Sequence, residues 1–238
     1  MRLSMFVAFL HLNQFRSVSC LLGFVLLLSA CTSTKDASQT DNADLQERPA
    51  NASNYERDLV YPRETEYFVS EGNLVVYEDP FYGAAIAYVD KRDYPDIITV
   101  FFYPIPTTSW NNLDVALNGE VEEFLTELDN TVKVGVYQRR GQEVLSDFMI
   151  NKNGQTYRGK KVHFDFANQQ GTEFNADAYI FIQKDKFVKI RTSSPKDFTP
   201  DWNGDLIAEE LIPEFDVPDE SEYMRKLRDE YRRQPPTN

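Results

Sequence analysis

The feature that most constrains the fold is a series of short β-branched and aromatic runs separated by turn residues. The run 97–103 is apolar at both odd and even positions, which predicts a central strand covered on both faces. In the run 162–166, apolar and polar residues alternate, which places His163 and Asp165 together on a polar face. The same alternation places Lys189 and Arg191 on the polar face of their strand. We therefore expect a half-buried antiparallel sheet with one solvated face.

The other strands are predicted from the same patterns. Turn signals at Asn153-Gly154 and Lys184-Asp185 separate pairs of runs that can form hairpins. The predicted strands cover residues 74–77, 83–89, 96–103, 132–138, 144–150, 157–166, 178–183 and 187–192.

Three helices are expected. Apolar residues at helical spacing predict the first over 113–128, with Asn112 as its N-cap. A second is predicted over 205–215, where Pro213 should truncate or kink it. The segment 221–233 is highly charged, and we interpret it as a solvated helix, with a docking element as the alternative. The expected class is α+β, a mostly antiparallel sheet packed with helices.

The first thirty residues differ in kind from the rest. Arg2 and Arg16 are the only charged residues before Lys35, and an apolar run of about a dozen residues follows Arg16. A bilayer-spanning helix needs roughly 20 apolar residues, so this run is short for a membrane span. The layout predicts a secretory signal over residues 1–30. The alternatives are an uncleaved amino-terminal anchor helix and an ordinary signal in which the cysteine at position 31 has no special role.

The end of this segment, Leu28-Ser29-Ala30-Cys31, resembles the lipobox of bacterial lipoproteins. The resemblance implies cleavage before Cys31, a diacylglycerol on its thiol, and acylation of the new amino terminus by fatty acids such as palmitate. Several acyl chains give a stable membrane anchor, whereas one chain is marginal. The residue after the cysteine is Thr32 rather than aspartate, which in Gram-negative lipoproteins implies the outer membrane, facing the periplasm.

The remaining residues are expected to form a flexible tether followed by one domain. Residues 31–55 are rich in polar residues and poor in large aliphatic ones, which predicts a lipidated flexible tether. Residues 56–217 are assigned to a single α+β domain, and residues 218–238 to the charged carboxyl-terminal helix and tail. The net charge of −13 argues against nucleic acid as a partner, because phosphate backbones are bound by basic surfaces.

The order of the predicted elements over 74–215 is similar to the PsbP-like α/β sandwich and to uncharacterised periplasmic proteins of that shape. The resemblance includes Tyr157-Arg158-Gly159-Lys160-Lys161 before one strand and the segment 189–195 leading to a helix. It implies an accessory or binding role and carries over no site residues.

Three motifs suggest chemistry, and we interpret each as structural. Ser193 and Lys196 match the S-x-x-K pattern, but Pro195 disfavours the helical turn that this nucleophile requires. His163 is the one histidine after the signal segment, and no activated partner accompanies it. The segment 201–205 has oxygen ligands at alternate positions, although its glycine is misplaced for a calcium loop. We therefore predict no catalytic residue, metal or cofactor, and ligand-binding residues stay unknown.

The function that these observations favour is a non-catalytic, membrane-anchored periplasmic lipoprotein that binds a protein partner of the cell envelope. One alternative is a small-ligand or glycan-binding module that uses an aromatic face of the sheet. Another is a hydrolase with carboxylates alone, which requires two acidic residues facing each other across a cleft.

Overall fold

A computed structural model describes residues 53–79, 81–92, 94–105, 112–198 and 204–233, except for the side chains of 223, 227, 228, 231 and 232. The expected signal segment, Cys31 and nearly all of the tether lie outside these residues. Every described residue belongs to one compact unit, Ala50–Asn238.

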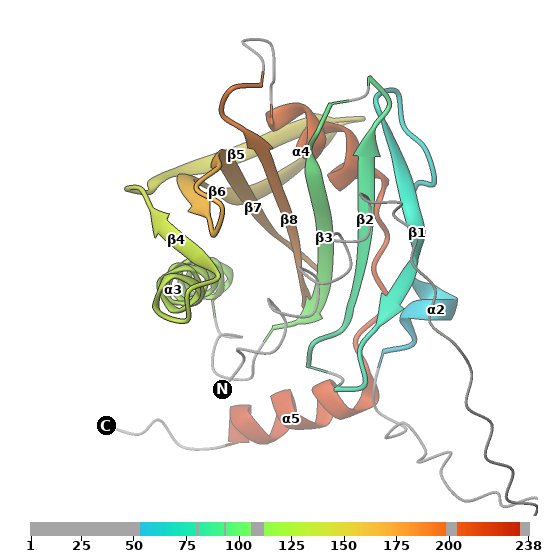
Figure 1. The fold of residues 1–238 in the computed structure, drawn as a ribbon. Helices are drawn as coiled ribbons and strands as arrows, with labels where there is room; N and C mark the ends of the chain where they lie inside the picture. The colour runs from blue at the N-terminus through green and yellow to red at the C-terminus, as the bar shows by residue number, and fades with distance from the viewer. Residues whose placement is uncertain (1–52, 80, 93, 106–111, 199–203, 234–238) are drawn as a thin grey trace, which may run out of the picture. The chain divides into compact units, whose positions relative to one another are not determined.

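Eight strands within the described residues form one antiparallel sheet (Figure 1). Its order is β1-β2-β3-β8-β7-β6-β4, and β5 also pairs with β6. β4 pairs with the carboxyl-terminal end of β6, whereas β5 pairs with its amino-terminal part. The strands are β1 (Phe68–Val76), β2 (Ala84–Asp90), β3 (Ile97–Pro104), β4 (Tyr137–Arg140), β5 (Val144–Lys152), β6 (Gln155–Asn168), β7 (Glu173–Gln183) and β8 (Lys186–Pro195).

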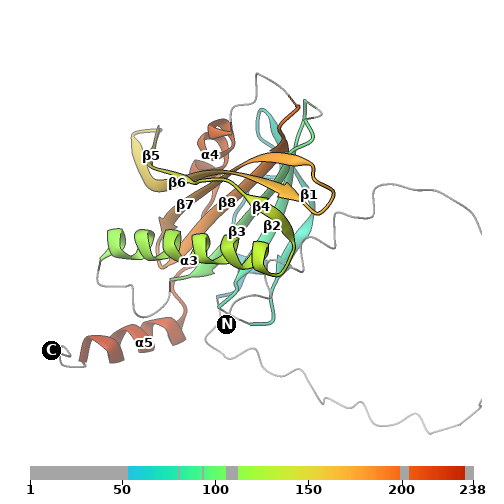
Figure 2. The ribbon, with the colours of Figure 1, turned by 60° about the vertical axis from the view of Figure 1, so that its left-hand side comes forward.

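Helices cover both faces of this sheet. Helix α3 crosses one face, and α4 with the short helix η2 packs on the other (Figures 1 and 2). The described helices are α2 (Tyr55–Asp58), α3 (Leu113–Lys133), α4 (Asp205–Leu211), the 3-10 helix η2 (Ile212–Glu214) and α5 (Glu222–Arg233). The predicted α+β class, a mostly antiparallel sheet packed with helices, is confirmed.

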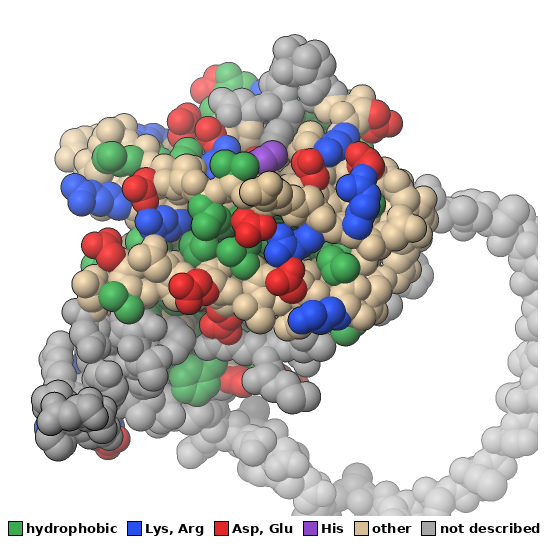
Figure 3. Space-filling model, turned by 90° about the vertical axis from the view of Figure 1, so that its left-hand side faces the viewer, with side chains coloured by type: hydrophobic (Ala, Val, Ile, Leu, Met, Phe, Trp, Pro, Cys, Tyr) green, Lys and Arg blue, Asp and Glu red, His purple; other side chains and the backbone are tan. Residues whose placement is uncertain are grey.

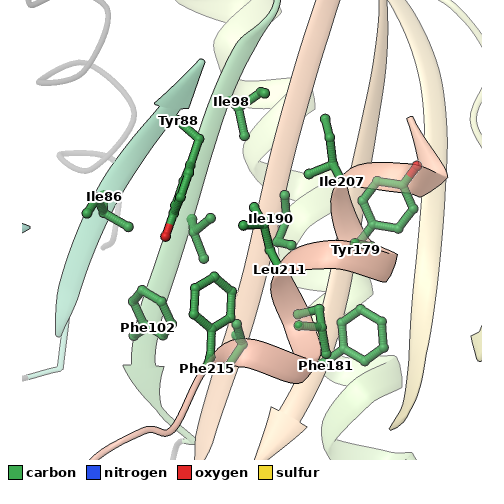
Figure 4. Close-up of a cluster of buried hydrophobic side chains, with 14 of the residues drawn as sticks. Ile86, Tyr88, Ile98, Phe102, Tyr179, Phe181, Ile190, Ile207, Leu211 and Phe215 are labelled. Carbon is green, nitrogen blue, oxygen red and sulfur yellow. The ribbon is translucent and has the colours of Figure 1, made fainter. Parts of the chain in front are cut away.

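The larger core lies between the sheet and α4 with η2 (Figure 4). Phe102 and Phe215 meet edge to face there, with ring centroids 5.0 Å apart. Burial of each such side chain contributes about 1.5–3 kcal/mol. Tyr55 belongs to the same core and is 3% exposed, although the sequence places it at the end of the tether. The packed body therefore begins upstream of residue 56.

A second apolar layer lies under α3. Phe124 and Leu128 are fully buried, and the ring of Phe124 packs edge-on against Phe164 at 5.9 Å. The predicted N-cap is confirmed, because the side chain of Asn112 accepts a hydrogen bond from the Asp114 N–H.

The prediction that one face of the sheet is solvated is wrong. Lys189 is only 7% exposed, because α3 covers it and Glu120 on that helix pairs with its ammonium group. Alternation of polar and apolar residues does not distinguish a solvated lysine from one that faces a buried carboxylate. Each face of the sheet therefore carries its own packed layer.

The predicted strand at 132–138 is also wrong in its position. Helix α3 continues to Lys133, the chain then turns at Gly135 with a φ of +74°, and β4 begins only at Tyr137. Other local predictions are confirmed. β3 is buried from Ile98 to Pro104, and α4 gives way to η2 immediately before Pro213.

Candidate functional site

The free edge of β5 is the surface that most resembles an interaction site. Within the described residues, β5 is hydrogen-bonded to β6 alone, so its other edge presents unpaired backbone N–H and C=O groups. Three of its side chains are large, apolar and exposed: Val144 at 60%, Leu145 at 52% and Met149 at 59%. An unpaired edge and exposed apolar side chains are the two features that strand addition uses.

The strand is held in place from one face only. Phe148 packs edge-on against Tyr179, with ring centroids 5.1 Å apart, and Ile150 is buried in the same core. Leu145 and Met149 have the opposite parity and therefore point to the other face. Figure 3 shows this side of the molecule, where hydrophobic side chains lie exposed among charged ones.

One carboxylate stands between these two apolar side chains. The side chain of Asp147 is 86% exposed, and it accepts a 2.6 Å hydrogen bond from Lys160, its directly opposite neighbour on β6. This hydrogen bond holds the pKa of Asp147 below its usual range. The outer face of β5 thus presents an apolar, an acidic and an apolar side chain in turn, those of Leu145, Asp147 and Met149.

The alternation over 144–150 predicts this strand, but it does not identify the strand's edge as a site. The signal was present in Leu145, Asp147 and Met149, which have the opposite parity to Phe148 and Ile150, the two residues of this strand that pack on the core. Only the sheet order shows that no described strand covers them.

His163 belongs to a charged network on the α4 face. Its Nδ1 lies 2.9 Å from Oδ1 of Asp177, the directly opposite residue on β7, and Asp177 is 3% exposed. On the other side, the opposite residue on β5 is Val144, so no hydroxyl or thiol is in register with the imidazole. This is the cross-strand hydrogen-bonding role expected for a lone histidine.

The same network reaches helix α4 through Asp205. Its Oδ1 accepts hydrogen bonds from Lys161 at 2.5 Å and from the hydroxyl of Tyr179 at 2.8 Å. Burial is the largest cause that raises the pKa of Tyr179, and nearby Asp177 adds to it. The phenol is therefore a hydrogen-bond donor at neutral pH, and the network joins the first turn of α4 to the sheet.

The S-x-x-K pair has no helical geometry. Ser193 lies in β8, which is extended as far as Pro195. The ammonium group of Lys196 lies 2.6 Å from the Asp165 carboxylate. Such an arrangement does not bring the lysine one helical turn from the serine.

An acidic pocket of about 230 Å³ lies beside α4 and η2. Glu210 accepts hydrogen bonds from the Thr65 hydroxyl and the Tyr67 N–H, and Glu214 pairs with Lys152 at 3.1 Å. A hydrogen bond from Lys91 lowers the pKa of Glu64, the opposite of what a general acid needs. The lining residues are Pro62, Glu64, Thr65, Glu66, Lys152, Glu210 and Glu214, with no aromatic side chain among them.

Two further predictions fall wholly or partly outside the described residues. These are the lipid attachment at Cys31 and the calcium-like segment 201–205, of which Asp205 is described. Among the described residues, no group of three or more His, Cys, Asp or Glu side chains is arranged to hold a metal ion. None of the described helices combines the length and hydropathy that crossing a bilayer requires.

Comparison with known proteins identifies no family. No family model matches the chain, and no curated protein matches it. Among solved structures, it is similar to the solution structure of cyanobacterial PsbP (CyanoP) from Synechocystis sp. PCC 6803, with a TM-score of 0.42 and 15% sequence identity. The match covers 80% of this chain and 98% of that chain. Similarity at this level assigns no activity.

Proposed function

We propose that this protein is a non-catalytic accessory of the cell envelope, anchored by lipid to the periplasmic face of the outer membrane, and that it binds another protein through the edge of β5. The observation that carries the binding role is the exposure of Val144, Leu145 and Met149 along an edge that no described strand covers. Natural edge strands are commonly protected by lysines, prolines or bulges, which makes exposed aliphatic side chains there informative.

A protein is a better occupant of this edge than the hydrocarbon of a bilayer. Unpaired backbone N–H and C=O groups are costly in lipid, because no water or partner satisfies them. A strand of another protein satisfies these groups and covers the apolar side chains at the same time.

The anchoring role is supported by the sequence Leu28-Ser29-Ala30-Cys31 at the end of a short apolar segment. Lipid on that cysteine would hold the β5 edge near membrane proteins and so raise their effective concentration. The non-catalytic role is supported by the charged clusters of the described residues. The clusters at His163, Lys196 and Glu210 consist of side chains engaged with one another.

The proposal is tested by site-specific photocrosslinking in living cells. A photoreactive amino acid replaces Leu145, and the control carries it at Val75, which is 39% exposed on β1 at the opposite end of the sheet. We expect one reproducible adduct with an envelope protein from position 145, and its reduction when Cys31→Ala removes the anchor. The same adducts from both positions, or none from position 145, would contradict the binding role.

A further inference from the structure

The register of β5 defines what kind of segment fits its edge. We propose that the edge takes up an extended segment with a basic residue opposite Asp147 and aliphatic residues two positions away on each side, opposite Leu145 and Met149. This inference rests on the proposed function and specifies the chemistry of the partner.

The three side chains act as one row because they share a face. Side chains directly opposite each other on neighbouring antiparallel strands lie about 4.5–5.5 Å apart at Cβ. On β6, the residues opposite Leu145, Asp147 and Met149 are Val162, Lys160 and Arg158. An added strand approaches from the other side of β5, where Asp147 is 86% exposed and has no described neighbour strand. The Asp147 carboxylate already accepts a hydrogen bond from Lys160 on the β6 side, and its exposed side is open to a second cation from the added strand. Aliphatic residues on either side of that cation cover Leu145 and Met149.

A second copy of the chain fits this edge poorly. The symmetric antiparallel register that matches Leu145 with Met149 of the other copy also places the two Asp147 carboxylates opposite each other. Like charges directly opposite are destabilising. The neighbouring symmetric registers place each Asp147 against Leu145 or Met149 instead. The row is therefore not self-complementary.

The chain's own tether also lacks the required pattern. Its basic residues are Lys35 and Arg48, and the residues two positions away are Ser33, Ala37, Gln46 and Ala50, none of them a large aliphatic residue. A basic partner is favoured at longer range as well, because the chain carries a net charge of −13.

The test uses two synthetic peptides and the full mature lipidated protein in nanodiscs. The probe is Thr-Val-Thr-Lys-Thr-Val-Thr, whose sequence is the same in both directions. It can therefore place lysine opposite Asp147 and valines opposite Leu145 and Met149 in either a parallel or an antiparallel strand. The control peptide has glutamate in place of lysine. We expect calorimetry to show about tenfold weaker binding of the control peptide. The variant Asp147→Lys should invert this preference.

Two further variants locate the binding. Leu145→Asp should abolish binding of the lysine peptide, whereas Val75→Asp, on the opposite edge strand, should leave it unchanged. Equal binding of both peptides to the wild type, or no inversion in Asp147→Lys, would overturn the inference. So would a dimer of the wild type that Leu145→Asp dissociates, since a second copy would then occupy the edge. If the peptides fail while the crosslink from position 145 succeeds, the stated chemistry is wrong and the proposed function stands.

Discussion

Lys189 on β8 donates a hydrogen bond to Glu120 on α3, with 3.0 Å between Nζ and Oε1, and the two side chains are 8% and 3% exposed. The hydroxyl of Tyr103 donates to the same carboxylate. Helix α3 is therefore fixed on the sheet by a buried ion pair as well as by its apolar side chains Phe124 and Leu128.

Removal of one partner should destabilise the fold strongly. Glu120→Ala leaves the Lys189 ammonium group buried without its hydrogen-bond acceptor, which costs about 3–5 kcal/mol in comparable pairs. We expect a loss at the lower end of this range, because the Glu127 carboxylate lies 3.9 Å from the same nitrogen and still offers it an opposite charge. Urea unfolding measures the loss. The control Glu122→Ala, at an exposed position of the same helix, should stay within about 0.5 kcal/mol of the wild type, and equal losses would refute the buried pair.

The glycine immediately before β2 should tolerate no side chain. Gly83 has a φ of +64°, and a Cβ there would lie 1.8 Å from the carbonyl oxygen of Phe102. We expect Gly83→Ala to lower the free energy of unfolding by more than about 3 kcal/mol, from backbone strain and overlap together. Gly72 has a similar φ of +74° but open space around it, so Gly72→Ala should cost only about 1–2 kcal/mol. Similar losses in the two variants would mean that the contact with Phe102 is not as described.

Stability should fall in alkali because of buried phenols. Burial raises the pKa of Tyr77 to about 12 and also raises the pKa of Tyr55, Tyr88 and Tyr179. The unfolded chain loses these protons near pH 10, so above that pH the folded chain binds more protons than the unfolded one. The free energy of unfolding therefore decreases as pH rises from about 10 to 12.

Urea unfolding on either side of pH 10, with phenolate absorbance as the second readout, measures this effect. Tyr77→Phe should make the decrease shallower. Lys186 has the opposite effect on the free energy of unfolding. Burial lowers its pKa, so the folded chain loses this proton before the unfolded chain does, and stability rises as pH approaches 10.5. A flat profile above pH 10 in Lys186→Met, from which the opposing contribution of Lys186 is absent, would contradict the burial of these tyrosines.

The two members of the His163–Asp177 pair should differ in their effect on stability. Asp177→Ala removes the buried carboxylate that lies 2.9 Å from His163 and 3.7 Å from Lys161, so both lose a partner, and we expect a loss of about 1–3 kcal/mol. His163→Ala should cost less, because its side chain is 42% exposed and water replaces part of the lost bond. Thermal unfolding measures both. A larger loss for His163→Ala would indicate that the imidazole, rather than the carboxylate, organises this network.

Local rules predicted much of the fold from the sequence. The apolar run at 97–103 predicted a central strand, and the structure buries it between β2 and β8. Asn112 and Pro213 marked helix ends because capping and proline geometry act within a few residues. Elements whose pattern, cap or breaker lies within one short segment were therefore predictable.

Features that depend on distant contacts were not predictable in this way. The local pattern around Lys189 predicts a solvated residue, because its partner Glu120 on α3 lies 69 residues away in the sequence. The exposure of the β5 edge depends on which strands close the sheet, and no pattern inside 144–152 encodes that order. For the same reason, the proposed binding surface follows from the sheet order rather than from a motif.

We propose that lipid on Cys31 holds this protein at a membrane. The direct measurement is mass spectrometry of the amino-terminal peptide from the protein purified out of the membrane fraction. We expect a chain that begins at Cys31 and carries a diacylglycerol on its thiol and a fatty acid on its amino group. A free thiol at Cys31, or peptides from residues 1–30 in the membrane-bound protein, would contradict it.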